Sequence, residues 1–277
     1  MAIITISRGS MSGGKALGEC VAAALGCSCI AREVLVEAAA KLGVSEEFLR
    51  ERIERSPGFW DRLTAERRTY VLAAQAALAD HVRGGDVVYH GLAGHLLLRE
   101  VPKVLRVRLI APVEARVRAL MEQRGMTRES AESFIDEVDH HRARWTRLMY
   151  DADIEDPRLY DLVVNLEKTS IESACAVVVT MAQRPEFVID DAARIRLRDF
   201  ALACRVRAAL AVQPASRGLA LEVAASNGVV TLSGEIPRPD MLTHASERWI
   251  GELRRVVEEV QGVKSVVLDV HLVSAYR

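Results

Sequence analysis

The stretch "ISRGSMSGGKALG" (residues 6–18) follows directly on the apolar run "AIIT" (residues 2–5). It contains a loose phosphate-binding loop, in which Gly9 is followed by four residues and then by Gly14 and Lys15. The flanking residues predict a strand before the loop and a helix that begins inside it, which is the context such a loop needs. Backbone N–H groups at the helix start would then face a phosphate, and Lys15 would add a positive charge.

The residue after the lysine is less typical of such a loop. A hydroxyl is expected there or one residue later, and this chain has Ala16 and Leu17. In phosphate-loop enzymes that hydroxyl holds magnesium during phosphoryl transfer. The magnesium ligand is therefore unassigned. Three interpretations remain open at this point: a working nucleotide site, a decayed one, and a glycine-rich turn with a surface lysine.

Composition limits the class of protein. The 277 residues are 50% hydrophobic and 27% charged, with a formal net charge of −1. These values predict a globular chain of roughly two domains and give no reason to expect nucleic-acid binding. The chain has no apolar run of membrane-spanning length and begins without a signal-like segment. We expect a cytoplasmic protein with no transmembrane segment.

The cysteines have neither zinc-site nor C-x-x-C spacing. We therefore expect free, reduced thiols rather than disulfides or a metal centre at Cys20, Cys27, Cys29, Cys175 and Cys204.

The first two-thirds of the chain alternates short apolar runs with helical patterns. The alternation predicts an α/β fold in which a parallel sheet is flanked by helices. The expected strands are 2–7, 27–30, 86–90, 103–111 and 160–165, and the expected helices are 15–26, 32–83 with a break at 56–58, 113–150 and 170–183.

The last third has a different pattern. Residues 184–192 are predicted to be a linker, and an amphipathic helix begins at residue 193. Two alternating strands then flank Asn227-Gly228, a favoured hairpin turn, before a second helix and a closing strand. The order α-β-β-α-β predicts a smaller α+β domain over residues 193–277, following a first domain over residues 1–183.

Three later segments, together with the opening one, resemble the cytidylate kinase-like family over roughly residues 1–183. They are residues 86–126, the lid-like "DEVDHHR" (136–142) with its D-x-x-D-x-x-R pattern, and "DPRLYDLVVN" (156–165). The resemblance implies a P-loop kinase fold and transfer of the γ-phosphoryl group of ATP to CMP or dCMP, with Mg²⁺. One departure is Gly91-Leu92, because the family has an arginine in place of this leucine to contact the monophosphate. His90, His95 or Arg32 could replace it.

The resemblance also implies site residues. The ATP-binding loop would comprise Gly9, Ser10, Ser12, Gly13, Gly14, Lys15 and Ala16. The catalytic residues would be Lys15, Arg142, Arg144 and Asp139, and the acceptor would contact Arg32, Asp161 and Arg147. The lid residues have a second interpretation, because Asp136, Asp139, Arg142 and Arg144 also suit a solvated, salt-bridged helix.

The last third resembles the BON domain through "NGVVTLSGEI" (227–236) and "VQGVKSVVLDVHLV" (260–273). This resemblance implies binding of a small ligand, a lipid or a protein partner. A packing or dimerisation module in a homo-oligomer is the alternative.

The leading hypothesis is a kinase that acts on a small nucleotide. Ala16, Leu17 and Leu92 favour the main alternative, a catalytically impaired nucleotide sensor that signals through its BON domain. A third hypothesis is an envelope-associated lipid-binding protein.

Overall fold

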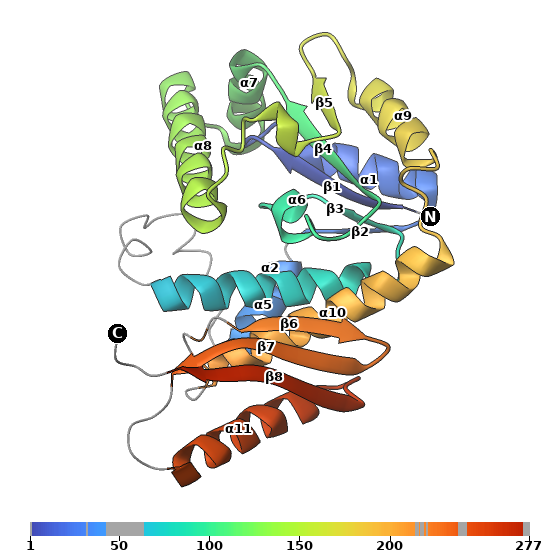
Figure 1. The fold of residues 1–277 in the computed structure, drawn as a ribbon. Coiled ribbons are helices and arrows are strands. Elements are labelled where there is room, and N and C mark those ends of the chain that lie inside the picture. Colours follow the sequence, from blue (N-terminus) through green and yellow to red (C-terminus); the bar gives the residue numbers. More distant parts are fainter. Residues whose placement is uncertain are drawn as a thin grey trace.

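The computed structural model describes residues 2–31, 33–42, 64–213, 216, 219, 221–237 and 243–273 (Figure 1). The expected helix break at 56–58 and the candidate acceptor ligand Arg32 lie outside these residues.

The first domain contains a five-stranded sheet in the order β2-β3-β1-β4-β5, and every pairing is parallel. Its strands are β1 (Ile3–Arg8), β2 (Ser28–Ile30), β3 (Val87–Tyr89), β4 (Val104–Ile110) and β5 (Leu162–Asn165). The predicted parallel α/β sheet is confirmed. Because β1 lies at its centre, the loop that follows β1 opens at the edge where parallel sheets bind ligands.

Helices pack on both faces of this sheet, which buries the first five residues of β1 on both sides. Ile4 and Ile6 are buried in the core formed with α1 (Gly14–Leu25) and α9 (Ile171–Ala182). Ile3 is buried in the other core, which holds residues of several helices. The remaining helices of this domain are α2 (Glu33–Leu42), α5 (Thr64–Val82), α6 (Gly94–Leu97), α7 (Val113–Arg124), α8 (Arg128–Tyr150) and the short 3-10 helix η1 (Pro157–Leu159).

One disulfide corrects the expectation of free thiols. Cys20 of α1 and Cys175 of α9 are bonded, with their Cα atoms 6.1 Å apart. The pair was invisible in the sequence because 155 residues separate the two cysteines, which meet only when the two helices pack side by side. Cys27, Cys29 and Cys204 are free thiols.

The second domain has the predicted α-β-β-α-β order and a three-stranded sheet. Its elements are α10 (Asp191–Val212), β6 (Glu222–Ser226), β7 (Val229–Pro237), α11 (Thr243–Glu258) and β8 (Ser265–Val273). β7 is central, antiparallel to β6 and parallel to β8. Val223, Val230, Leu232 and Val266 form one core with both helices, as their alternation predicted.

Helix α10 belongs to both domains. Ala193 and Leu197, near its start, are buried in the core of the first domain, whereas Val206 and Leu210 are buried in that of the second. The segment 184–192 is not exposed throughout, because Ile189 is only 5% exposed and lies in the first core. The division into separate domains remains a prediction, but the junction is a continuous helix rather than a loose tether.

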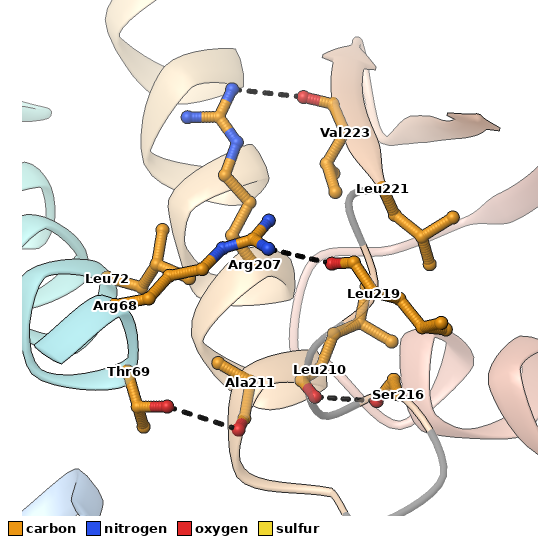
Figure 2. Close-up of a pocket in the computed structure, with 10 residues that line it drawn as sticks. All are labelled: Arg68, Thr69, Leu72, Arg207, Leu210, Ala211, Ser216, Leu219, Leu221 and Val223. Carbon is orange, nitrogen blue, oxygen red and sulfur yellow. Dashed lines mark hydrogen bonds between the residues drawn. The ribbon is translucent and has the colours of Figure 1, made fainter. Parts of the chain in front are cut away.

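Small side chains let α5 and α10 approach closely. Ala76 and Ala79 of α5 are buried against Ala201 and Cys204 of α10. At the α5 end shown in Figure 2, Arg68 donates to the Leu219 carbonyl at 2.9 Å, so α5 also contacts the strand-side loop of the second domain. α5 therefore connects the two domains. Within the described residues, no helix has the length and apolar character needed to cross a bilayer.

Candidate active site

The glycine loop connects β1 to α1 as the sequence predicted. Gly13 caps α1 with a φ of 77°, a conformation that favours glycine. At Gly14 the constraint is steric, because a Cβ there would lie 2.0 Å from Cδ of Arg8. The two glycines thus shape a tight turn whose N–H groups and helix end suit an anion.

Lys15 is the exposed cation of this turn. Its side chain is 76% exposed, and Nζ lies 3.7 Å from a Glu19 carboxylate oxygen, one helical turn along α1. A weak surface pair of this kind leaves Lys15 able to move to a phosphate.

The loop does not fit a direct magnesium ligand at the usual place. Ala16 is exposed but has no oxygen in its side chain, and Leu17 is fully buried in the core. In the described part of the chain, no cluster of three or more metal-binding side chains occurs. We therefore derive no step through magnesium.

A buried arginine holds the loop from the inside. Arg116 of α7 donates to the Ser10 carbonyl at 2.6 Å and to Ser10 Oγ at 2.8 Å, and it also donates to the Asp139 carboxylate. Asp139 in turn accepts from the Ser10 backbone N–H at 2.8 Å. Ser12 is buried beside them, with its hydroxyl 3.4 Å from the same carbonyl. Asp139 thus holds the loop together with Arg116, and the catalytic role that the resemblance implied for it stays a prediction.

The three lid arginines have different environments on or beside α8. Arg142 lines a small pocket next to the loop. Arg144 is exposed, and Arg147 pairs with Asp153 at 3.2 Å, with both side chains more than half exposed. Arg142 is therefore the one that the structure brings to the loop edge.

That pocket, which we call the Arg8 pocket, has a volume of about 40 Å³. It is lined by Ser7, Arg8, Gly91, Leu92, Ala93, Arg142 and Ile154. Sequence reasoning missed Arg8, although it lies within the opening motif and ends a central strand. Its position before the glycines was a signal, but which way the side chain turns depends on the absence of a Cβ at Gly14.

A polar cluster lies behind the pocket. Arg108 donates to Ser7 Oγ at 3.1 Å, and the Tyr160 hydroxyl lies 3.2 Å from the same atom. The His95 ring stacks near Tyr160 at 4.7 Å and is 2% exposed. Burial, helped by the charges of Arg108 and Arg106, lowers the pKa of His95 to about 4. His95 is thus neutral at physiological pH and supplies no charge to a phosphate.

His90 is also an unsuitable cation. It is 9% exposed, and burial, followed by the charge of Arg8, lowers its pKa. Neither histidine therefore replaces the arginine that is absent at Leu92.

Asp161, which was expected to contact the acceptor, lies at the opposite end of its strand from the glycine loop. It precedes β5 and accepts from the Arg106 backbone N–H at 2.9 Å and from two atoms of its guanidinium at 3.0 and 2.8 Å. These bonds are at the amino end of β5, whereas the loop lies at the carboxyl ends of the strands. Asp161 thus joins β5 to β4, and the acceptor contact expected for it stays a prediction.

Comparisons with known proteins agree with this geometry. Residues 3–168 match the Cytidylate kinase-like family, and residues 198–273 match the BON domain. The chain is 36% identical over 83 residues to a cytidylate kinase of Methanosarcina barkeri (strain Fusaro / DSM 804). That match covers 28% of this chain and 43% of the curated relative, so the chain spans less than half of that protein's length.

Among the solved structures that match this chain, the first described here has a similar fold. An uncharacterized protein from Eubacterium ventriosum ATCC 27560 superposes with a TM-score of 0.52 at 16% identity, covering 65% of this chain and 97% of the other. A shikimate kinase from Acinetobacter baumannii has a TM-score of 0.39 at 13% identity, with 65% and 92% of the two chains covered.

Proposed function

The chain belongs to the cytidylate kinase-like family, and from that premise we propose that it transfers the γ-phosphoryl group of ATP to a nucleoside monophosphate, with CMP or dCMP as acceptor. The observation that carries the proposal is the adjacency of two features at one sheet edge. A glycine turn with an exposed Lys15 lies beside a pocket lined by Arg8 and Arg142. Donor and acceptor phosphates need such neighbouring sites, because phosphoryl transfer is largely a matter of positioning and charge neutralisation.

The loop and the arginines of α8 have different roles in the proposed transfer. The loop N–H groups and Lys15 hold the ATP phosphates, and Arg142 neutralises charge on the group in transfer. Arg144 and Arg147 are exposed on the same helix and act after α8 moves toward the ligands. Asp139 and Arg116 keep the loop in place. Mg²⁺ would screen charge on the ATP phosphates, but no side chain of the glycine loop is proposed to hold it.

A coupled phosphoryl-transfer assay against the nucleoside monophosphates tests the proposal. ATP binding is measured beside it by calorimetry, with and without Mg²⁺. We expect turnover with CMP or dCMP and its loss in Arg142→Gln. An exposed arginine, Arg158→Gln, is the matched control for removal of one charge. ATP binding without turnover on any acceptor would contradict the kinase proposal.

A second candidate function, a nucleotide sensor that signals through the BON domain, is supported by the position of α5. Tyr70 of α5 packs edge-on against Trp145 of α8, with 5.9 Å between the ring centroids, and Ala76 and Ala79 of α5 pack against α10. A ligand that moves α8 would thus act on α5, which contacts both domains. Amide hydrogen exchange in β6, β7 and β8 should change on ATP addition if the protein is a sensor, and stay constant otherwise.

A further inference from the structure

Arg8 has an unusual environment for an arginine. Its side chain crosses the first turn of α1, since a Cβ at Gly14 would lie 2.6 Å from Nε. Nε is buried, and none of the described residues accepts a hydrogen bond from it. Burial lowers the pKa of Arg8, yet a guanidinium stays charged at neutral pH. A buried charged donor without an acceptor costs free energy, so an anion at this point would be stabilising.

The Arg8 pocket matches an anion in charge and in size. Arg8 and Arg142 line it together, and no acidic side chain is among its described lining residues. Asp139, whose charge also acts on Arg8, is already bonded to Ser10 and Arg116. The volume of about 40 Å³ corresponds to roughly three water molecules, which is the scale of one tetrahedral oxyanion and not of a whole nucleotide.

The uncharged wall of the pocket is fixed in place. The Tyr89 hydroxyl donates to the Leu92 carbonyl at 3.2 Å, and a Cβ at Gly91 would lie 2.2 Å from that hydroxyl oxygen. The Gly91-Leu92 turn therefore contributes backbone and an apolar side chain, and the positive charge comes from Arg8 and Arg142 on the other elements.

We propose that Arg8 binds the phosphate of the acceptor nucleotide and takes the place of the arginine that is absent at Leu92. This inference rests on the proposed function for the identity of the acceptor. The anion site itself rests only on the pocket. Arg8 contributes a planar pair of donors, and Arg142 contributes the second cation from α8.

The test measures binding without turnover. CMP and, separately, orthophosphate are titrated into the full-length protein by calorimetry and ³¹P NMR, and ATP is titrated in parallel. The variants are Arg8→Gln, Arg8→Lys and the exposed control Arg158→Gln, with thermal melting to check folding. We expect Arg8→Gln to weaken the binding of CMP and of orthophosphate at least about tenfold, which is the effect of one lost charged hydrogen bond. The binding of ATP should weaken less than twofold. Arg8→Lys should weaken CMP by a smaller factor, and it carries the test if Arg8→Gln does not fold.

The outcomes separate this inference from the proposed function. If no monophosphate binds but orthophosphate still depends on Arg8, the anion site stands and the nucleotide acceptor is wrong. If CMP and orthophosphate bind equally well to Arg8→Gln, or if orthophosphate does not bind at all, the inference is overturned even where the protein turns over CMP. If Arg8→Gln lost as much affinity for ATP as for CMP, Arg8 would belong to the ATP site, and the inference would also be overturned.

Discussion

On its solvent side the glycine loop presents Lys15 and Ala16, both exposed on the first turn of α1. On its inner side it is held by the buried Arg116 and the half-buried Asp139, which both bond to Ser10. Groups on the solvent side make few contacts in the free protein, so they are available to a ligand. Groups on the inner side already take part in the fold, so changing one alters stability and binding together. The predictions below test this difference.

The largest effect is expected from Arg116, which makes three charged hydrogen bonds on the inner side. Arg116→Ala leaves the Ser10 carbonyl and the Asp139 carboxylate without this donor. We expect a loss of about 4 kcal/mol in the free energy of unfolding, measured by urea denaturation. Arg118→Ala, an exposed arginine on the same helix, should change it by less than about 0.5 kcal/mol. Equal losses in the two variants would contradict the distinction between the two sides.

The second effect is a pH dependence from His95. Above pH 6.5 the imidazole is neutral in both the folded and the unfolded states. Below that value the unfolded chain takes up a proton, whereas the folded protein does so only near pH 4. The free energy of unfolding should therefore fall by up to about 3 kcal/mol over this window.

The variant His95→Phe separates the contribution of His95 to the pH dependence from that of the carboxylates, which also titrate in acid. Its stability should fall less steeply than that of the unmodified protein between the two pKa values, because phenylalanine binds no proton. Parallel stability curves for the two proteins would show that His95 is not the buried neutral group described here.

The same contrast explains what could be predicted from the sequence. The apolar run at residues 2–5 and the glycine spacing placed β1, the loop and α1, because these signals are local. The inner side could not be predicted, since Arg116 meets Ser10 across 106 residues and Asp139 meets Ser10 across 129. The bonds of Asp161 could not be predicted for a related reason: its partner Arg106 belongs to a neighbouring strand, and the pairing register decides the contact.

The third effect concerns the solvent side and should change binding alone. Lys15→Ala should weaken ATP binding by about 2 kcal/mol, since it removes one charge-assisted contact to the phosphates. The free energy of unfolding of Lys15→Ala should stay within about 0.5 kcal/mol of that of the unmodified protein, because the exposed pair with Glu19 contributes little to stability. Calorimetry and urea denaturation check the two values, with the exposed Lys264→Ala as the control. An ATP affinity indifferent to Lys15→Ala would leave only a glycine-rich turn.

The smallest effect is expected at Leu92, which lines the Arg8 pocket. Leu92→Arg alone should change CMP affinity by less than about twofold, because Arg8 already supplies the contact and a third cation beside Arg8 and Arg142 is repelled. In the Arg8→Gln background, Leu92→Arg should regain most of the lost CMP affinity. The charge of Arg8 no longer repels the new arginine, and the phosphate needs a donor in place of Arg8. The coupling between the two positions should then be about 1.4 kcal/mol, measured by calorimetric titration of all four proteins with CMP. A tenfold gain from Leu92→Arg alone would mean that the pocket had no phosphate ligand before the change, and Arg8 would then be a structural arginine.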